Sequence, residues 1–131
     1  MRIHISTSDG VPIYLQIVNQ IKYLAASGRL APGEQLPPVR KLAEDLVVNP
    51  NTVARVYTEL EREGILNTRP GLGVFVAQPG SELSRKVRKE RLREALDRFL
   101  TEAVHLGFPA DEVVALVSEQ AKQFRWSDKD S

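Results

Sequence analysis

The stretch from Pro38 to Ala77 constrains the fold most, because two short helical patterns and two strand patterns follow one another in it directly. Apolar residues recur at helical spacing from Pro38 to about Leu46. A second helix begins at Asn49, a good N-cap, and Pro50 suits its first helical position. Its expected inner face consists of Val53, Val56, Tyr57 and Leu60. Two helices this close, the second opened by polar side chains, are typical of a helix-turn-helix.

The residues behind the second helix predict a β-hairpin. Residues 65–69 have the pattern of a strand, 70–73 that of a tight Pro-Gly-Leu-Gly turn, and 74–77 that of a returning strand. A helix over 11–27 and a turn-rich connection over 29–37 come before the helix pair. The sequence therefore predicts an α+β fold, with a winged helix-turn-helix domain over residues 1–79.

The chain changes character at Pro79-Gly80-Ser81. A long helix is expected from Ser81 to about Leu106, and a last helix over 110–126. Two amphipathic helices are too little to close a core of their own, so residues 80–131 are expected to form a small two-helix C-terminal dimerisation region. The expected interface residues are Leu92, Leu96, Phe99, Val113, Leu116, Val117 and Phe124.

Composition excludes several classes of protein. A chain of 131 residues has no room for a large catalytic fold, and without cysteine it forms neither disulfides nor thiolate metal sites. No apolar run approaches the roughly 20 residues that span a bilayer, and the N-terminus lacks an apolar signal core, so we expect a cytoplasmic protein. His4 and His105 stand alone, and no nucleophile-base, P-loop or dinucleotide pattern occurs. We expect no cofactor, no metal and no enzymatic activity.

Six blocks in chain order resemble the N-terminal domain of GntR-family repressors. They cover about residues 11–77 and read PIYLQI, GRLAPG, LPPVRKLA, NPNTV, LEREG and GLGVFV. The NPNTV form and the two-helix tail are similar to the YtrA-type branch. The resemblance implies a DNA-binding transcription regulator that represses by blocking polymerase.

The same resemblance implies which residues meet double-stranded DNA. Carried over position by position, they are Arg40, Asn51, Thr52, Gly71 and Gly73. Many relatives carry Arg where this chain has Pro50 and Ala54, so base recognition cannot be copied from them. Arg55 is the candidate substitute.

The chemistry of the helix pair supports these roles beside simpler ones. Arg40 can bind phosphate or form paired hydrogen bonds with guanine. The alternative role for this arginine is a surface ion pair with Glu44. Asn51 and Thr52 lie at a helix N-terminus, which favours phosphate, and they could also serve as caps. Asn49 is first a cap and only second a DNA contact.

The wing and the tail offer further candidates. Thr68 and Arg69 on the wing strand could contact phosphate, or form a solvated strand edge. Gly71 and Gly73 could let the wing backbone approach DNA, or merely permit positive φ. The run 85–93 holds six basic residues and one acidic residue, and a solvated helix face explains it better than flanking phosphate contacts.

These expectations together predict a homodimer. Its two winged helix-turn-helix domains would bind a palindromic site with half-sites roughly 34–36 Å apart. One alternative is a winged helix that assembles with other proteins, but that interface would favour aromatic anchors over Arg40, Asn51 and a glycine-tipped wing. Another is the detached reader of a fused aminotransferase-like enzyme, which lacks support because no pyridoxal-binding lysine context is present. The small tail leaves little room for an effector pocket, although a small-molecule site between its helices or at the dimer interface stays open. The sequence names no ligand.

Overall fold

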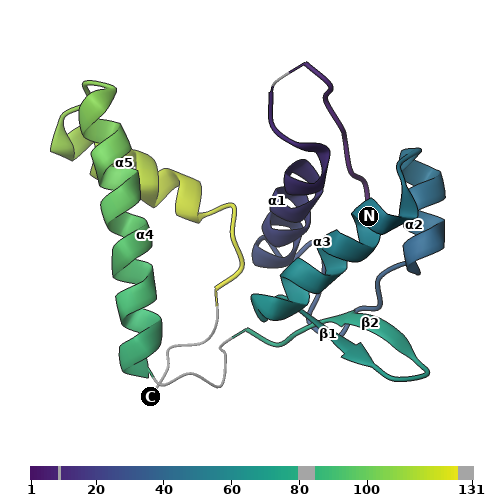
Figure 1. Ribbon diagram of the computed structural model, residues 1–131. Coiled ribbons are helices and arrows are strands. Elements are labelled where there is room, and N and C mark those ends of the chain that lie inside the picture. The colour runs from purple at the N-terminus through teal and green to yellow at the C-terminus, as the bar shows by residue number, and fades with distance from the viewer. Residues whose placement is uncertain (9, 80–84, 127–131) are drawn as a thin grey trace. The chain divides into compact units, whose positions relative to one another are not determined.

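A computed structural model describes residues 1–8, 10–79 and 85–126. The chain forms two compact units, one built on Met1–Pro79 and the other on Gly80–Arg125, and each is described by itself. The α+β architecture is confirmed, with a winged helix-turn-helix followed by a helical C-terminal region (Figure 1). The elements are α1 (Ile13–Ala26), α2 (Val39–Leu46), α3 (Pro50–Arg62), β1 (Leu66–Arg69), β2 (Gly73–Val76), α4 (Arg85–His105) and α5 (Ala110–Ala121).

The first unit closes around one hydrophobic core. Helix α3 lies at its centre and packs against α1, α2 and β1. All the inward positions expected for α3 are buried, and α1, α2, the loop between them and both strands contribute further side chains. The buried residues are Ile17, Val18, Ile21, Leu30, Leu36, Leu42, Ala43, Val53, Val56, Tyr57, Leu60, Leu66 and Val76. This continuous core fixes the helix pair and the hairpin as one body.

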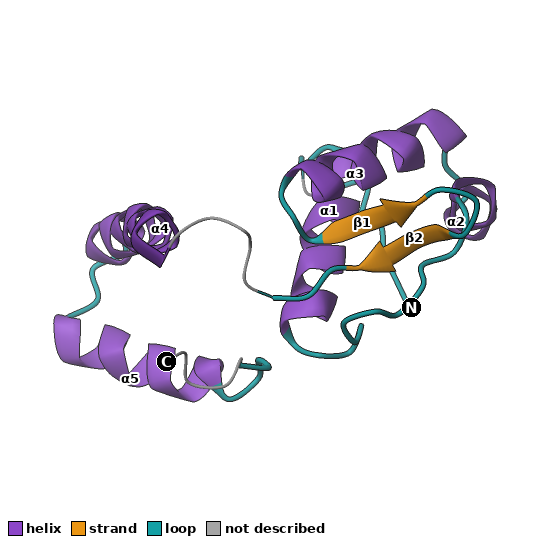
Figure 2. Cartoon of the chain, turned by 90° about the horizontal axis from the view of Figure 1, so that it is seen from below, coloured by secondary structure: helices purple, strands orange, loops and turns teal. Residues whose placement is uncertain are grey.

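The hairpin receives a third backbone segment that the sequence did not predict. Strands β1 and β2 pair antiparallel, from Leu66 opposite Val76 to Arg69 opposite Gly73. Figure 1 shows the hairpin beneath α3, and Figure 2 shows the two strands broadside. The Leu36 N–H donates to Val74 O over 2.8 Å, and Val76 N–H donates to Glu34 O over 2.8 Å. The turn-rich connection therefore runs antiparallel beside β2 over a few residues, joined to it by an isolated β-bridge between Gln35 and Phe75.

Two glutamines on α1 hold the N-terminal segment. Gln20 Oε1 accepts from His4 N–H over 2.9 Å, and its Nε2 donates to His4 O over 2.6 Å. One turn earlier, Gln16 forms the same two-way pair with the backbone of Ser6, over 2.8 and 2.7 Å. Each amide replaces the backbone partner that a neighbouring strand would supply. This role accounts for a polar Gln16 that is only 8% exposed.

The turn between α2 and α3 contains one strained residue. Val47 ends α2 in the left-handed conformation, with φ 56° and ψ 51°. Its N–H donates to Glu44 O over 3.2 Å, and the side chain is 89% exposed. β-branched residues rarely adopt this conformation, since Cβ approaches the following carbonyl oxygen. The backbone of the turn therefore imposes the left-handed conformation on Val47, and burial of the side chain does not offset the strain.

The tail helices differ from expectation at their ends. Helix α5 ends at Ala121, not at Trp126, and Phe124 N–H donates to Ala121 O in the turn that follows. Polar residues around position 122 leave no apolar stripe to extend the helix. The predicted start at Ser81 and the C-terminal residues 127–131 lie outside the described residues. In the part of the chain that the structure describes, no helix combines the length and apolar character needed to cross a bilayer.

Candidate nucleic-acid interface

The N-terminus of α3 is exposed and carries a cap. Asn49 Oδ1 accepts from Asn51 N–H over 2.7 Å, and Thr52 N–H donates to Asn49 O over 2.9 Å. Asn49 and Asn51 are exposed, and Thr52 is half-buried. The first turn of α3 holds no acidic residue. The positive end of the helix dipole therefore faces solvent without a carboxylate to offset it, which favours an anion there.

Charge is distributed unevenly along α3. The glutamates lie in its C-terminal half and just beyond it, where Arg62 pairs with Glu59 and Lys22 Nζ lies 2.8 Å from Glu63 Oε1. The side-chain hydrogen bond from Arg62 lowers the pKa of the Glu59 carboxyl. Along α3 the acidic groups thus gather away from the capped end, so of the two ends of this helix the start repels a polyanion less.

Arg40, the second residue of α2, is exposed. Within the described ranges it forms no ion pair, and the alternative pairing with Glu44 is not made. Its neighbour Lys41 instead reaches Asp45 at 3.1 Å, one turn along the helix. The N–H donors of the Arg40 guanidinium therefore have no carboxylate partner among the residues that the structure describes.

Arg55 lies differently from Arg40. Its guanidinium carbon is 3.7 Å from the centroid of the Tyr14 ring, so the exposed arginine lies against α1 in a cation–π contact. The contact fixes the guanidinium plane beside α3. The Arg55 guanidinium is therefore held in place by Tyr14, whereas the Arg40 guanidinium has no ion pair with any described residue.

The wing strand β1 carries Thr68 and Arg69, and both are exposed. The guanidinium carbon of Arg69 is 4.3 Å from the centroid of the Phe75 ring on β2. Thr68 N–H donates to Glu61 Oε2 over 3.2 Å. The first contact orients Arg69 across the hairpin, and the second links the wing to α3.

The two wing glycines have different surroundings. Gly71, at the tip, has φ 76° and open space where a Cβ would lie. Gly73 has φ 126°, and a Cβ there would lie 2.5 Å from Gln35 Nε2. That Nε2 donates to Leu72 O over 2.8 Å. The backbone angle and the contact with Gln35 therefore both favour glycine at position 73, while Gly71 leaves the wing tip without a side chain.

Sequence reasoning missed two residues that position the surface. Gln35 attaches the loop before α2 to the wing tip, and Tyr57 Oη on α3 donates to Pro37 O over 2.6 Å. Burial raises the pKa of Tyr57 from 10.0 to about 12, so its hydroxyl remains a donor. Glutamine in a turn carries no pattern, and the helical spacing of Tyr57 indicated only a core residue. Together they hold α2, α3 and the wing in fixed relation.

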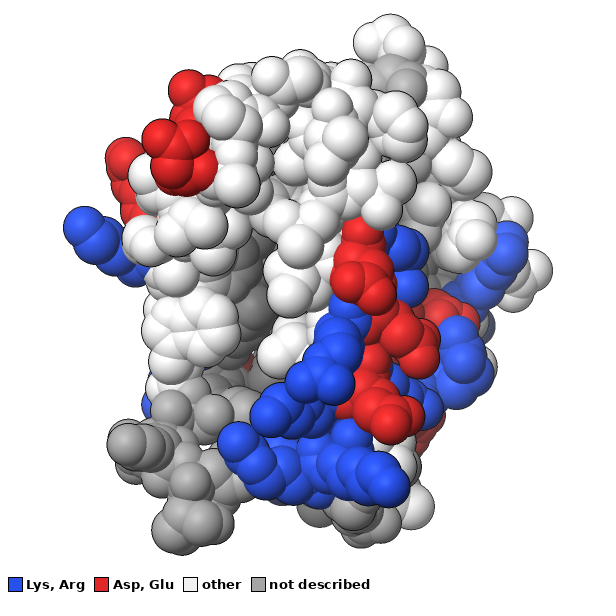
Figure 3. All heavy atoms as spheres, turned by 90° about the vertical axis from the view of Figure 1, so that its left-hand side faces the viewer, with Lys and Arg blue, Asp and Glu red and all other residues white. Residues whose placement is uncertain are grey.

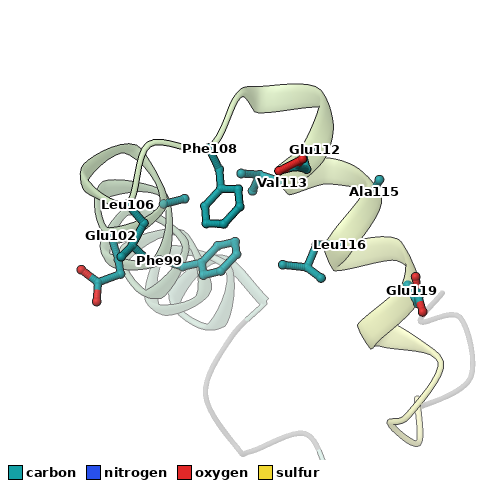
Figure 4. Close-up of a pocket in the computed structure, with 10 residues that line it drawn as sticks. Phe99, Glu102, Leu106, Phe108, Glu112, Val113, Ala115, Leu116 and Glu119 are labelled. Carbon is teal, nitrogen blue, oxygen red and sulfur yellow. The ribbon is translucent and has the colours of Figure 1, made fainter.

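The tail unit leaves most of its apolar side chains in solvent. Among its described residues, only Ala103 and Val113 are buried. Of the expected interface residues, Leu92 is 70% exposed, Leu96 47%, Phe99 42%, Leu116 58% and Val117 46%. Val113 instead packs within the chain, and Phe124 is half-buried beyond the end of α5. Phe99, Val113 and Leu116 share an open groove of about 480 Å³ between α4 and α5 (Figure 4).

Comparisons with known proteins agree with this arrangement. Residues 13–76 match the family described as bacterial regulatory proteins, gntR family. The chain is 42% identical over 103 residues to the uncharacterized HTH-type transcriptional regulator YhcF of Bacillus subtilis, covering 79% of this chain and 84% of that one. It is 34% identical over 117 residues to the HTH-type transcriptional repressor YtrA of the same organism, covering 89% and 90%. A solved transcriptional antiterminator from Listeria monocytogenes superposes with a TM-score of 0.78 at 32% identity, covering 100% of this chain and 98% of that one.

Proposed function

Since this chain belongs to the GntR family of bacterial regulatory proteins, in its YtrA-like branch, we propose that it represses transcription by binding a palindromic operator as a homodimer. The observation that carries the proposal is an exposed Arg40 at the start of α2, with no ion pair to any residue that the structure describes, together with the capped, acid-free N-terminus of α3. A guanidinium and a helix N-terminus both favour phosphate, and Arg can also pair with guanine in the major groove. The N-terminus of α3 then enters the groove.

The proposal implies three classes of contact with DNA. Arg40 and Arg55 approach bases or phosphates at the groove, and Asn51 and Thr52 offer side-chain and backbone donors at its edge. Thr68 and Arg69 bind phosphates along the wing, with Gly71 letting the tip come close. Asn49 remains mainly the cap of α3, and Gly73 mainly keeps the wing attached to Gln35.

The homodimer rests on the exposed apolar face of the tail. Burying a large apolar side chain contributes about 1.5–3 kcal/mol, and Leu92, Leu96 and Phe99 are all available for this. A symmetric pair covers such a face by using it twice. Residues 80–131 are then the dimerisation region and residues 1–79 the DNA-binding domain.

The direct test is retardation of the gene's own promoter fragment by the purified protein over a series of salt concentrations. We expect a specific complex for which the logarithm of the association constant falls linearly with the logarithm of salt concentration, since contacted phosphates release counterions. A scrambled fragment of equal length is the control and should bind much more weakly. Equal binding to both fragments, or to neither, would contradict sequence-specific repression.

A truncated chain separates the two proposed regions. Residues 1–79 hold the continuous core, so they should fold alone as a monomer. Their affinity for the promoter fragment should fall strongly, because the two half-site contacts are no longer coupled. Sedimentation and thermal unfolding check the first expectation, and titration of the DNA checks the second. A truncated chain that still dimerises would place the main interface in the winged domain.

A further inference from the structure

One face of α4 changes chemistry along its length. At about 3.6 residues per turn, every third or fourth residue returns to the same side of a helix. The resulting row begins with basic residues, continues with large apolar ones, and ends beside the groove. We name it the pairing face, and it consists of Arg85, Arg88, Leu92, Leu96 and Phe99 on α4, with Leu106 directly after the helix.

The groove at the end of the pairing face has acidic edges. Phe99, Leu106 and Phe108 line it from α4 and the turn after it, and Val113 and Leu116 line it from α5. Figure 4 shows both phenyl rings and Leu116 pointing inward, with Glu102 and Glu119 at opposite edges.

Glu112 is the third carboxylate of this groove, and no basic residue lines it. None of the three glutamates forms an ion pair with any residue that the structure describes. The groove therefore suits an apolar segment that also carries positive charge.

The basic end of α4 is such a segment. Residues 85–93 include six basic residues and one acidic residue, together with Val87 and Leu92. Figure 3 shows Lys and Arg gathered toward the lower end of the view, next to a column of acidic side chains and below a mostly uncharged upper part. One chain thus carries both a basic apolar segment and an acidic apolar groove. Within one straight helix, however, the two ends of the pairing face cannot meet.

We propose that the groove binds the basic N-terminal half of α4 from a second copy, so that the two α4 helices pair antiparallel. The inference rests on the proposed homodimer and specifies its geometry. A twofold axis near Leu96 places Arg85 and Arg88 of each copy beside the acidic groove of the other. The dimer therefore contains two equivalent contacts, and each copy supplies the basic segment to one of them and the acidic groove to the other.

Charge excludes the opposite arrangement. A parallel pair would set the basic runs 85–93 of both copies side by side, and the groove carboxylates against each other. Like charges brought together in an interface oppose association, whereas the antiparallel pair brings opposite charges together. Both arrangements bury Leu92, Leu96 and Phe99, so the charged ends and not the apolar centre select the orientation.

Distance measurements between spin labels on the full-length dimer test the orientation. The chain contains no cysteine, so single Lys86→Cys and Glu94→Cys variants each take one label. Both positions lie off the pairing face. With an axis near Leu96, the antiparallel dimer separates the two labels at 86 by about 30 Å along the helix and those at 94 by only about 6 Å. A parallel dimer adds no axial separation at either position.

The expected result is a clearly longer distance between the copies at 86 than at 94. Equal distances in a dimer would overturn the antiparallel arrangement and leave the homodimer standing. If sedimentation finds monomers and no distance between copies is measured, the homodimer fails first. The two failures are therefore distinguishable.

Charge reversal tests the groove itself. The variant Glu102→Lys/Glu112→Lys/Glu119→Lys should weaken dimerisation by about tenfold or more, because it repels Arg85 and Arg88 of the second copy. The matched control is Glu90→Lys/Glu94→Lys/Asp97→Lys, which makes the same change of charge on the opposite side of α4. The control should dimerise at least as well as the parent.

A rescue completes the test. The variant Arg85→Glu/Arg88→Glu should also dimerise poorly, and mixing it with the groove variant should restore a heterodimer. Undiminished dimerisation of the groove variant would show that the groove carboxylates do not hold the second copy, and would overturn the proposal.

Discussion

The two units of this chain use similar amphipathic helices with opposite results. In the winged unit, three helices and a hairpin surround one core, and α3 is covered on several sides. In the tail unit, α4 and α5 cover each other only around Ala103 and Val113, and their other large apolar side chains face solvent. A hydrophobic stripe becomes a core only when a third layer closes over it, and in the tail that layer has to come from outside the chain.

The largest expected effect tests whether the tail is completed by a second copy. Leu96→Glu places a charge at the centre of the pairing face, and we expect monomers or aggregates together with loss of operator binding. Sedimentation and DNA titration measure both. Thr101→Glu is the matched control, because it adds the same charge at an exposed position on the opposite side of α4. A Leu96→Glu protein that stays dimeric, with normal DNA affinity, would place the interface elsewhere.

The same substitution in both units sharpens the contrast. Leu60 is fully buried in α3, and Leu60→Ala should lower the free energy of unfolding by about 2–5 kcal/mol at every protein concentration. Leu92 is largely exposed, so Leu92→Ala should matter only through association, with an effect that depends on protein concentration. Denaturant titrations at two well-separated concentrations distinguish them. Identical behaviour of the two variants would remove the contrast between the units.

Arg40→Ala tests the reading surface without touching either core. The side chain is exposed and unpaired among the described residues, so the unfolding temperature should not change. Operator affinity should fall by about 1–3 kcal/mol, the size of one good base contact. Lys41→Ala is the control, because Lys41 already pairs with Asp45. Wild-type affinity in the Arg40→Ala protein would remove this residue from the interface.

The smallest effect concerns the turn of the helix pair. Replacing Val47 with glycine should raise the free energy of unfolding by about 0.5–1 kcal/mol, since relief of the left-handed strain exceeds the cost of glycine's greater freedom when unfolded. Val47→Ile keeps the strain and should leave stability unchanged. Thermal unfolding of the fragment 1–79 measures both. A destabilised glycine variant would mean that the exposed valine side chain contributes contacts to the fold.

Most of the winged fold could be predicted from the sequence because its signals are local. Asn49 and Pro50 mark the start of α3, the spacing of Val53, Val56 and Leu60 marks its buried side, and the glycines mark the wing turn. Pairing of residues 33–36 with β2 could not be predicted, because backbone hydrogen bonds leave no mark on the side-chain pattern. The left-handed Val47 was missed for a related reason, since the residue type argues against the conformation.

The candidate site likewise has features that the sequence could predict and features that it could not. Residue chemistry indicated Arg40, but only the structure shows that its pairing with Glu44 is not made. It likewise shows Arg55 against Tyr14 and Arg69 against Phe75, because contacts between distant elements depend on how the chain folds back. The DNA contacts themselves and the dimer interface remain predictions. These contacts involve a DNA duplex and a second copy, and the contacts within one chain do not define them.

The attachment of the wing has a thermodynamic consequence. Gln35 holds the tip through Leu72 O, the backbone of residues 34 and 36 pairs with β2, and Thr68 is linked to Glu61. A disordered loop loses about 1–2 kcal/mol of conformational entropy for each residue that becomes ordered on binding. This wing has already lost most of that entropy during folding. Its contacts with DNA would therefore contribute nearly their full strength to affinity, as in other preorganised binding surfaces.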